Sequence, residues 1–237
     1  GEDIFCHTFA VCAWVLMCRV SNVAELRGAH LSWENDSIVI SMVKHKADQE
    51  GERTDPKHCY ANPFNPSACV VTAFAIYFAV YGAPTARHNA VFEGSRQHDR
   101  FVDAVRRVLE NNPRLKAEMD RLGITAEDVA AHSFRKGGRS YAQGGTTGGP
   151  STPSILLRGL WALEGLDKKY VRYEAAADQF IGRILAMLDI NSPDFAVLCP
   201  HFDVIDETVT DAVRCCFPGA PIELECVLVN CLASLVY

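Results

Sequence analysis

The chain contains 237 residues, of which 49% are hydrophobic and 22% are charged, a balance that is typical of a packed globular protein and excludes a wholly disordered chain. Its longest uncharged apolar runs lie within residues 4–18 and 68–81, and both are shorter than the about 20 residues that cross a bilayer, so we expect a soluble protein. The net charge of −6 is uneven, because residues 174–237 hold two basic and ten acidic side chains, whereas residues 132–173 hold seven basic and two acidic ones. The basic stretch is compatible with a nucleic-acid surface.

Hydrophobic periodicity predicts a mainly helical α+β fold with one small antiparallel sheet near the N-terminus. Runs rich in β-branched residues and bounded by turn residues indicate strands at 30–33, 37–43 and 58–60. Apolar residues at helical spacing, several of them after Ser, Thr or Pro and before Gly, predict helices at 4–18, 67–80, 100–109, 113–122, a short one from 125, 133–142, 151–160 and 174–188.

The last part of the chain differs from the rest in composition. Residues 190–237 are acidic, contain five of the ten cysteines and end in the apolar run 227–237. We therefore expect one domain over residues 1–189, followed by a C-terminal extension over 190–237 that packs on this domain or on a partner.

The cysteines do not suggest a metal site. None of the ten forms a C-x-x-C pair, the spacing typical of zinc ligands and of redox sites. Most lie among Ala, Val and Leu, so we interpret them as free thiols that fill the core in a reducing compartment. Residues 144–151 have two glycines at P-loop spacing, but Pro150 occupies the lysine position, which argues against a nucleotide site. No cofactor is expected.

Four separated motifs supply the side chains that phosphate chemistry needs. An arginine follows the first apolar helix, which offers it no partner, so it must find one elsewhere. Two lysines belong to the expected hairpin loop, an H-x-x-R motif places its two side chains on one helix face, and a tryptophan precedes a tyrosine by nine residues. In chain order these residues are Arg19, Lys44, Lys46, His132, Arg135, Trp161 and Tyr170.

In this order, and with a sheet between the first two motifs, the residues resemble the catalytic domain of the tyrosine recombinases, the family of the phage integrases. The resemblance covers about residues 3–188. The stretches KHCYANPFNPSAC, HSFRKGG and DFAVLCPHF are most similar to the recombinase domains of eukaryotic Crypton-type mobile elements. The resemblance implies site-specific cleavage and rejoining of DNA through a 3′-phosphotyrosyl intermediate, for recombination or integration of a mobile element.

The resemblance also implies catalytic roles. Tyr170 is the nucleophile that attacks the scissile phosphate. Arg19 and Arg135 neutralise its non-bridging oxygens, for which a permanently charged guanidinium fork is suited. Lys46 protonates the leaving 5′-oxygen from the hairpin. No metal takes part in this chemistry.

Two further residues complete the catalytic set that the resemblance implies. His132 accepts the tyrosine proton or holds the phosphate, and Trp161 donates its indole N–H to a non-bridging oxygen. The expected partners are double-stranded DNA and three further copies of the chain, in the nucleus. Contacts with the DNA are expected from Lys44, Lys136, Arg139, Lys168, Lys169 and Arg172.

Several of these residues also have a purely structural interpretation. Arg19 is equally suited to cap a helix or to pair with Glu25. His132 is suited to be the N-cap of its helix, and Arg135 to belong to an exposed basic cluster.

The other assignments have rivals as well. Lys44 competes with Lys46 for the hairpin role, and Trp161 is equally an ordinary core residue in its Leu-rich surroundings. Tyr173 is the rival nucleophile, three residues beyond the spacing that the family favours.

The chain departs from the family pattern in two ways. Asn22 stands where the family usually has an acidic residue, and the N-terminal core-binding domain expected in the full-length protein is missing. Three alternatives therefore remain: a domesticated, non-catalytic DNA-binding or interaction module of the same fold, an enzyme of the type IB topoisomerase class, and an unrelated helical scaffold whose motifs match by coincidence.

Overall fold

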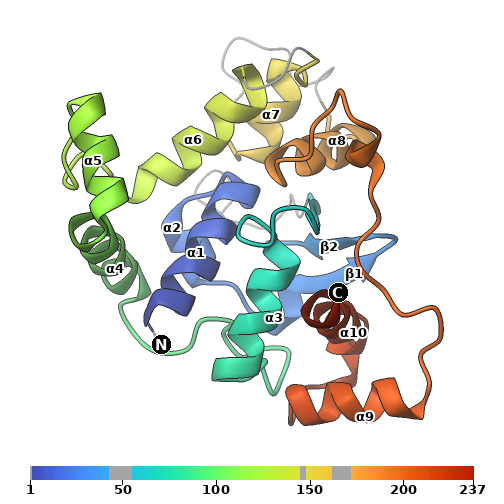
Figure 1. Ribbon diagram of the computed structural model, residues 1–237. Helices are drawn as coiled ribbons and strands as arrows, with labels where there is room; N and C mark the ends of the chain where they lie inside the picture. The colour runs from blue at the N-terminus through green and yellow to red at the C-terminus, as the bar shows by residue number, and fades with distance from the viewer. Residues whose placement is uncertain (1, 43–54, 145–147, 162–171) are drawn as a thin grey trace.

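The computed structural model describes residues 2–42, 55–144, 148–161 and 172–237. These residues form a mainly helical α+β fold with one three-stranded antiparallel sheet, as the hydrophobic pattern predicts. The helices, shown in Figure 1, are α1 (Glu2–Leu16), α2 (Val20–Ala24), α3 (Val70–Tyr81), α4 (Gln97–Asn111), α5 (Pro113–Leu122), α6 (Ala131–Gly144), α7 (Thr152–Arg158), α8 (Ala175–Leu185), α9 (Glu207–Cys216) and α10 (Glu225–Val236).

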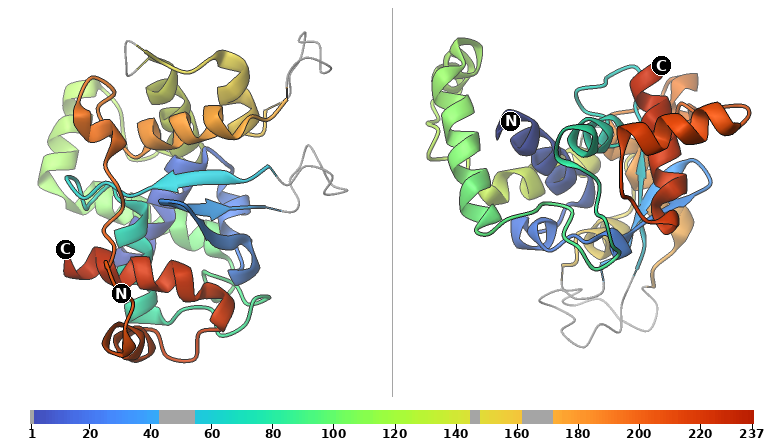
Figure 2. Two further views of the ribbon diagram at one scale, coloured as in Figure 1. Left: turned by 90° about the vertical axis from the view of Figure 1, so that its right-hand side faces the viewer. Right: turned by 90° about the horizontal axis from the view of Figure 1, so that it is seen from below.

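The sheet has the strand order β1 (Leu31–Glu34), β2 (Ser37–Ile40) and β3 (Lys57–Tyr60), so each strand pairs with its neighbour in the sequence. The strand predicted over 37–43 ends at Ile40. All four residues of β2 and of β3 are buried, because α8 and α1 pack on β3 and α10 packs on β1. Figure 2 shows the sheet between helices on either side.

The core forms around α1, which is apolar on most of its surface and contacts α3, α4, α6 and α8. Phe5 and Phe9 are fully buried, and Phe9 stacks on Phe101 with ring centroids 4.7 Å apart. Burying each such ring stabilises the fold by about 1.5–3 kcal/mol. This core holds the C-terminal end of α1 in place.

The C-terminal segment packs on the body of the chain. Residues of α10, such as Leu228 and Cys231, belong to the same hydrophobic core as Phe5 and Phe9. Neither α9 nor α10 was expected from the sequence. Helix α9 carries one signal that was overlooked, since the carboxylate of Asp206 accepts a hydrogen bond from the backbone N–H of Val209, as an N-cap does.

Two local predictions are wrong. No helix begins at Thr125, because the carboxylate of Asp128 accepts hydrogen bonds from both the backbone N–H and the hydroxyl of Thr125 and closes a turn instead. Helix α3 is capped by the thiol of Cys69, which accepts from the N–H of Thr72, and not by Ser67. In both places a short side chain accepts a hydrogen bond from a nearby backbone N–H. The spacing of apolar and capping residues in the sequence does not show which side chain will do so.

All ten cysteines are free thiols, and seven of them are buried, which agrees with their interpretation as small core residues. Cys215 and Cys226 are exposed. None of the helices in the described part of the chain is long and apolar enough to cross a membrane.

Candidate anion-binding site

The site begins where α1 ends. Met17 adopts a left-handed backbone conformation with φ of 46°, which is uncommon for a residue with a side chain, and the chain turns there. The turn places Arg19 at the first residue before α2, half-buried. It also turns the backbone carbonyl of Met17 towards α6.

Two glycines allow α6 to approach this turn. A Cβ atom on Gly138 would lie 2.9 Å from the backbone oxygen of Trp14, and one on Gly137 would lie 3.0 Å from the Trp14 ring. Both distances are shorter than normal contacts, so the two glycines of the HSFRKGG stretch permit the close packing of α6 on α1. This packing brings Arg135, on the preceding turn of α6, to the end of α1.

Arg135 is 7% exposed, so it does not belong to an exposed basic cluster. Its Nε donates to the backbone oxygen of Met17 at 3.1 Å, and its Nη2 donates to that of Gly159 at 2.6 Å. A guanidinium has five N–H donors, so these two bonds to carbonyl groups hold the side chain in place and leave other donors for a ligand.

Trp161 lies over the same guanidinium. Its ring centroid is 4.2 Å from Cζ of Arg135 and 5.1 Å from Cζ of Arg139, one turn further along α6. The half-buried ring also packs against the smaller core cluster that contains Met17 and Ile155. The ring therefore covers part of the core, as the structural interpretation expects, and it also faces two cations.

The local charge is positive and not compensated by the described residues. Burial lowers the pKa of Arg135, and the charge of nearby Arg19 lowers it further. Within the described ranges, no carboxylate lies within 4 Å of either guanidinium. Arg19 makes no side-chain cap of α2 and no ion pair with Glu25, so neither structural interpretation of Arg19 applies.

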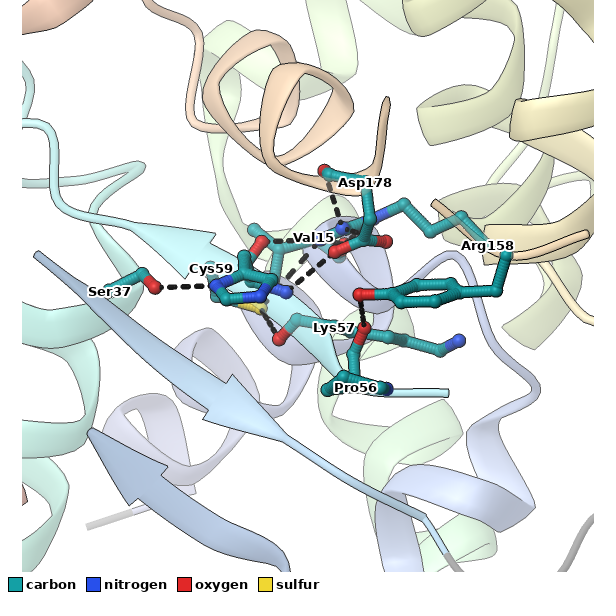
Figure 3. A network of polar contacts seen from close by, with 9 residues as sticks. Val15, Ser37, Pro56, Lys57, Cys59, Arg158 and Asp178 are labelled. Atoms are coloured by element: carbon teal, nitrogen blue, oxygen red, sulfur yellow. Dashed lines mark hydrogen bonds and ion pairs between the residues drawn. The ribbon is translucent and has the colours of Figure 1, made fainter. Parts of the chain in front are cut away.

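Lys57, the first residue of β3, is a further buried cation that the sequence did not predict. It is 2% exposed, and burial lowers its pKa. The nearby charge of Asp178 raises this pKa in part and that of Arg158 lowers it further, so Lys57 lies beside the pair formed by Arg158 and Asp178 (Figure 3). No ion pair of Lys57 occurs among the described residues. The position of a lysine directly before an apolar strand segment was the sequence feature that could have pointed to Lys57.

A second buried arginine, at the end of α7, lies in a different environment (Figure 3). Nη1 of Arg158 pairs with the carboxylate of Asp178 at 2.6 Å, and its other donors bond to the backbone oxygens of Val15 and His58. The second oxygen of Asp178 accepts from the backbone N–H of His58 at 2.7 Å. This network ties α1, β3, α7 and α8 together and pairs the charge of Arg158 with that of Asp178.

The remaining predicted residues are placed as follows. His132 is exposed and lies one residue inside α6, so it is not the N-cap. Lys136 and Arg172 are exposed. Asn22 is buried in α2 and its backbone N–H donates to the oxygen of Arg19. The expected residues outside the described ranges are Lys44, Lys46, Lys168, Lys169 and Tyr170.

Tyr173, the rival nucleophile, has a structural role. Its hydroxyl donates to the backbone oxygen of Pro56 at 2.8 Å, and burial raises its pKa well above the usual value. A hydroxyl that holds the start of β3 and resists ionisation is poorly suited to attack a phosphate.

Comparisons of this chain with protein-family models, with curated proteins and with solved structures each find no match. The chemistry of the site therefore has to be argued from its geometry. Arg19, Arg135 and Arg139, gathered at one helix end with a tryptophan ring, form a site that favours an anion.

Proposed function

We propose that this chain binds a DNA phosphate at the cluster around Arg135 and cleaves and rejoins the strand with Tyr170, as a site-specific recombinase does. The observation that carries the proposal is the pair of neighbouring guanidiniums, one of them buried, without a carboxylate partner in the described part of the chain. Two like charges in a desolvated place repel each other, and a phosphate dianion or diester bound between them removes that repulsion.

The order of the motifs supports the same function. Residues separated by more than a hundred positions, Arg19 and Arg135, come together at the end of α1, as the resemblance to the tyrosine recombinases requires. In the proposed reaction the two arginines stabilise the charge that develops on the non-bridging oxygens. Trp161 lies over the guanidiniums of Arg135 and Arg139 and limits the access of water to them.

The proposed reaction transfers the phosphoryl group twice, first to Tyr170 and then back to a DNA 5′-hydroxyl. Water does not hydrolyse the phosphotyrosyl bond, so the energy of the phosphodiester bond is kept. The Tyr170 oxygen forms a bond to phosphorus and loses its proton to His132 or to water, while the bond to the 5′-oxygen breaks and this oxygen takes a proton from Lys46. Rejoining is the reverse, with a 5′-hydroxyl as the nucleophile. Duplex DNA and a homotetramer are the partners of this proposal.

Trapping the covalent intermediate tests the proposal. A pool of duplexes nicked next to candidate scissile phosphates releases a short fragment after cleavage, so the enzyme remains attached to DNA and migrates more slowly on a denaturing gel. We expect this band with the wild-type chain and with Tyr173→Phe, whose hydroxyl is structural. We expect no band with Tyr170→Phe or with Arg135→Ala.

Other outcomes identify the alternatives. DNA binding without any adduct, in a chain extended at its N-terminus as well, indicates a non-catalytic module. Relaxation of supercoiled plasmid without a preferred sequence indicates the topoisomerase class. Absence of both DNA binding and adduct contradicts the proposal and leaves the arginine cluster as a site for a different anion.

A further inference from the structure

A second cavity, which shares no residue with the arginine cluster, lies beside the first hairpin of the sheet. Its volume is about 570 Å³, enough for a small organic ligand. Its walls come from β1, from the turn between β1 and β2, from the segment between α8 and α9, and from α10, which packs beside β1 (Figure 1). Among the residues that line it are Trp33, Asp36, Leu198, His201 and Asn230.

Two polar side chains of this cavity present hydrogen-bond acceptors. Nδ1 of His201 lies 2.9 Å from the backbone oxygen of Cys199. A carbonyl oxygen can only accept, so Nδ1 carries the hydrogen and Nε2 of the neutral ring is an acceptor. The amide nitrogen of Asn230 donates to the backbone oxygen of Cys226 at 2.8 Å, which leaves the side-chain oxygen Oδ1 of Asn230 for a ligand.

Asp36 adds a carboxylate to the cavity. Its Oδ2 accepts from Nη2 of Arg183 at 2.6 Å, and Arg183, which does not line the cavity, also donates to the backbone oxygens of Phe195 and Val197. The other oxygen, Oδ1 of Asp36, keeps its lone pairs. Residues 174–237 hold ten acidic and two basic side chains, Arg183 included, so a cation that enters the cavity meets a negative field.

Trp33 supplies an aromatic face. Its indole N–H donates to the backbone oxygen of Asn35 at 2.8 Å, so the polar edge of the half-buried ring is already satisfied and the ring is held in place. The face of such a ring carries the negative part of its quadrupole and attracts cations. The aromatic ring and the three acceptors therefore favour the same kind of ligand.

We propose that this cavity binds a primary alkylammonium group, either of a free aliphatic amine or of a lysine side chain. An ammonium group has three N–H donors and no acceptor, which matches Oδ1 of Asp36, Oδ1 of Asn230 and Nε2 of His201. The alkyl stem of the ligand packs against Trp33 and Leu198. The cavity and the arginine cluster thus select ligands of opposite charge, and the proposal does not depend on DNA cleavage.

Titration of the isotope-labelled chain with butylammonium, followed by NMR, tests the proposal. The chain has three tryptophans, and the indole N–H signal that is missing in Trp33→Leu identifies Trp33. We expect this signal to shift saturably, while the signals of Trp14 and Trp161 stay in place. Butanol has the same stem without the charge, and tetramethylammonium has the charge without N–H donors. Each is expected to bind at least about tenfold more weakly than butylammonium.

A pair of variants with the same change in charge tests the location. Leu198→Lys adds a cation at the rim of the cavity, where Leu198 is 58% exposed, and is expected to weaken the binding of butylammonium at least about tenfold. Val204→Lys adds a cation at a residue that is 70% exposed and does not line the cavity. It is expected to weaken binding less than about twofold, because solvent and salt screen its charge. Circular dichroism checks that each variant is folded.

A matched pair of probes distinguishes the two sources of the ammonium group. A tripeptide with blocked ends and a central lysine carries the same four-carbon stem and the same charge as butylammonium. Tighter binding of the tripeptide assigns the cavity to a lysine side chain of a partner protein, because the peptide backbone then adds contacts. Tighter binding of butylammonium assigns it to a free amine.

Three results overturn the proposal. A Trp33 signal that butylammonium does not shift means that no alkylammonium group binds. Equal binding of butylammonium and of butanol or tetramethylammonium means that the cavity does not select a primary ammonium group. Equal weakening by Leu198→Lys and Val204→Lys means that the acidic surface attracts cations without a site. None of these results bears on DNA cleavage, since the arginine cluster is unchanged in every variant.

Discussion

Arg135 and Arg158, the two buried arginines in the described part of the chain, differ in what surrounds them. Arg158 is 2% exposed and Arg135 is 7% exposed, and both donate to backbone carbonyls near the end of α1. Among the described residues, Arg158 is paired with a carboxylate, that of Asp178, and Arg135 is not. Burial alone lowers the pKa of Arg158, but Asp178 raises it above the usual value, whereas burial and Arg19 both lower the pKa of Arg135.

We expect this difference to separate a structural cation, Arg158, from the cation of the proposed anion site, Arg135. A buried charge that is fully paired holds helices in place and is costly to remove. A buried charge that lies next to a second cation destabilises the empty protein and is stabilised when an anion binds. The following predictions test that distinction.

The largest expected effect is on the structural arginine. Arg158→Met leaves Asp178 buried without its partner, and we expect the free energy of unfolding to fall by about 3–5 kcal/mol. Urea denaturation at neutral pH measures it. Adding Asp178→Leu removes the uncompensated charge and should recover part of the loss, although the N–H of His58 then lacks its acceptor. A loss below about 1 kcal/mol in the single variant would show that Arg158 is not structural.

The second prediction concerns the binding arginine. Inorganic phosphate at ten times its dissociation constant should stabilise wild type by about 1.4 kcal/mol, because it binds the folded state at the Arg135 cluster. Arg135→Met should lose this increment. Arg121→Met, which removes an exposed arginine paired with Glu118, is the matched control and should keep it.

Thermal unfolding in phosphate and in chloride at equal ionic strength provides the measurement. The general effect of phosphate on protein hydration is the same in all three chains, so the differences between them isolate binding. An equal phosphate response in wild type and Arg135→Met would remove the basis for a phosphate site.

The sequence draws attention to Arg135, the arginine of the proposed anion site, and not to Arg158. Arg135 stands in a local motif that also contains Gly137 and Gly138, so the close helix packing around it is encoded within seven residues. The network of Arg158 joins Val15, His58 and Asp178, which are far apart in the chain. The hydrophobic periodicity of the sequence cannot predict these hydrogen bonds and this ion pair, because they form between residues that meet only after the helices have packed.

The same reasoning explains the other successes and failures. Strongly periodic elements such as α4 and α5 were predicted within a few residues of their bounds, since one apolar face defines them. Helix α10 is apolar on most sides, so its run carried no helical signature. Lys57 was missed because its burial depends on α1 and α8 covering β3.

Lys57 provides a third, smaller effect that depends on pH. Its pKa in the folded state is lowered by burial, so between that pKa and about 10.4 the unfolded chain binds a proton that the folded chain lacks. The free energy of unfolding that depends on Lys57 therefore rises as the pH increases from the folded-state pKa towards the unfolded-state pKa. It falls again when the pH is lowered through the same range. In Lys57→Met the contribution is absent at every pH.

The measurement is a difference between two chains. The free energy of unfolding of wild type, minus that of Lys57→Met, should increase with pH by at most about 1.4 kcal/mol per pH unit in this window. Both chains contain the same thiols and tyrosines with raised pKa values, among them Cys59 and Tyr60. Their contributions to the pH dependence of the free energy of unfolding therefore cancel in the difference. A difference that is flat over the whole range would show that Lys57 keeps its ordinary pKa.

The smallest expected effect completes the comparison of the two arginines. Arg135→Met leaves the carbonyls of Met17 and Gly159 without a donor, at about 1 kcal/mol each, but it also removes a desolvated charge that Arg19 repels. These contributions oppose each other, so we expect a net change in the free energy of unfolding of about 1 kcal/mol or less, well below that of Arg158→Met.

The salt dependence separates those two contributions. Chloride screens the repulsion between Arg19 and Arg135 in wild type, so the stability of wild type should rise with ionic strength more steeply than that of Arg135→Met. Hydrogen bonds to neutral carbonyls have little dependence on salt, which makes the slope specific for the charge. Equal slopes in the two chains would mean that an anionic group already neutralises the pair in the free protein, and the arginine cluster would then be structural, as Arg158 is.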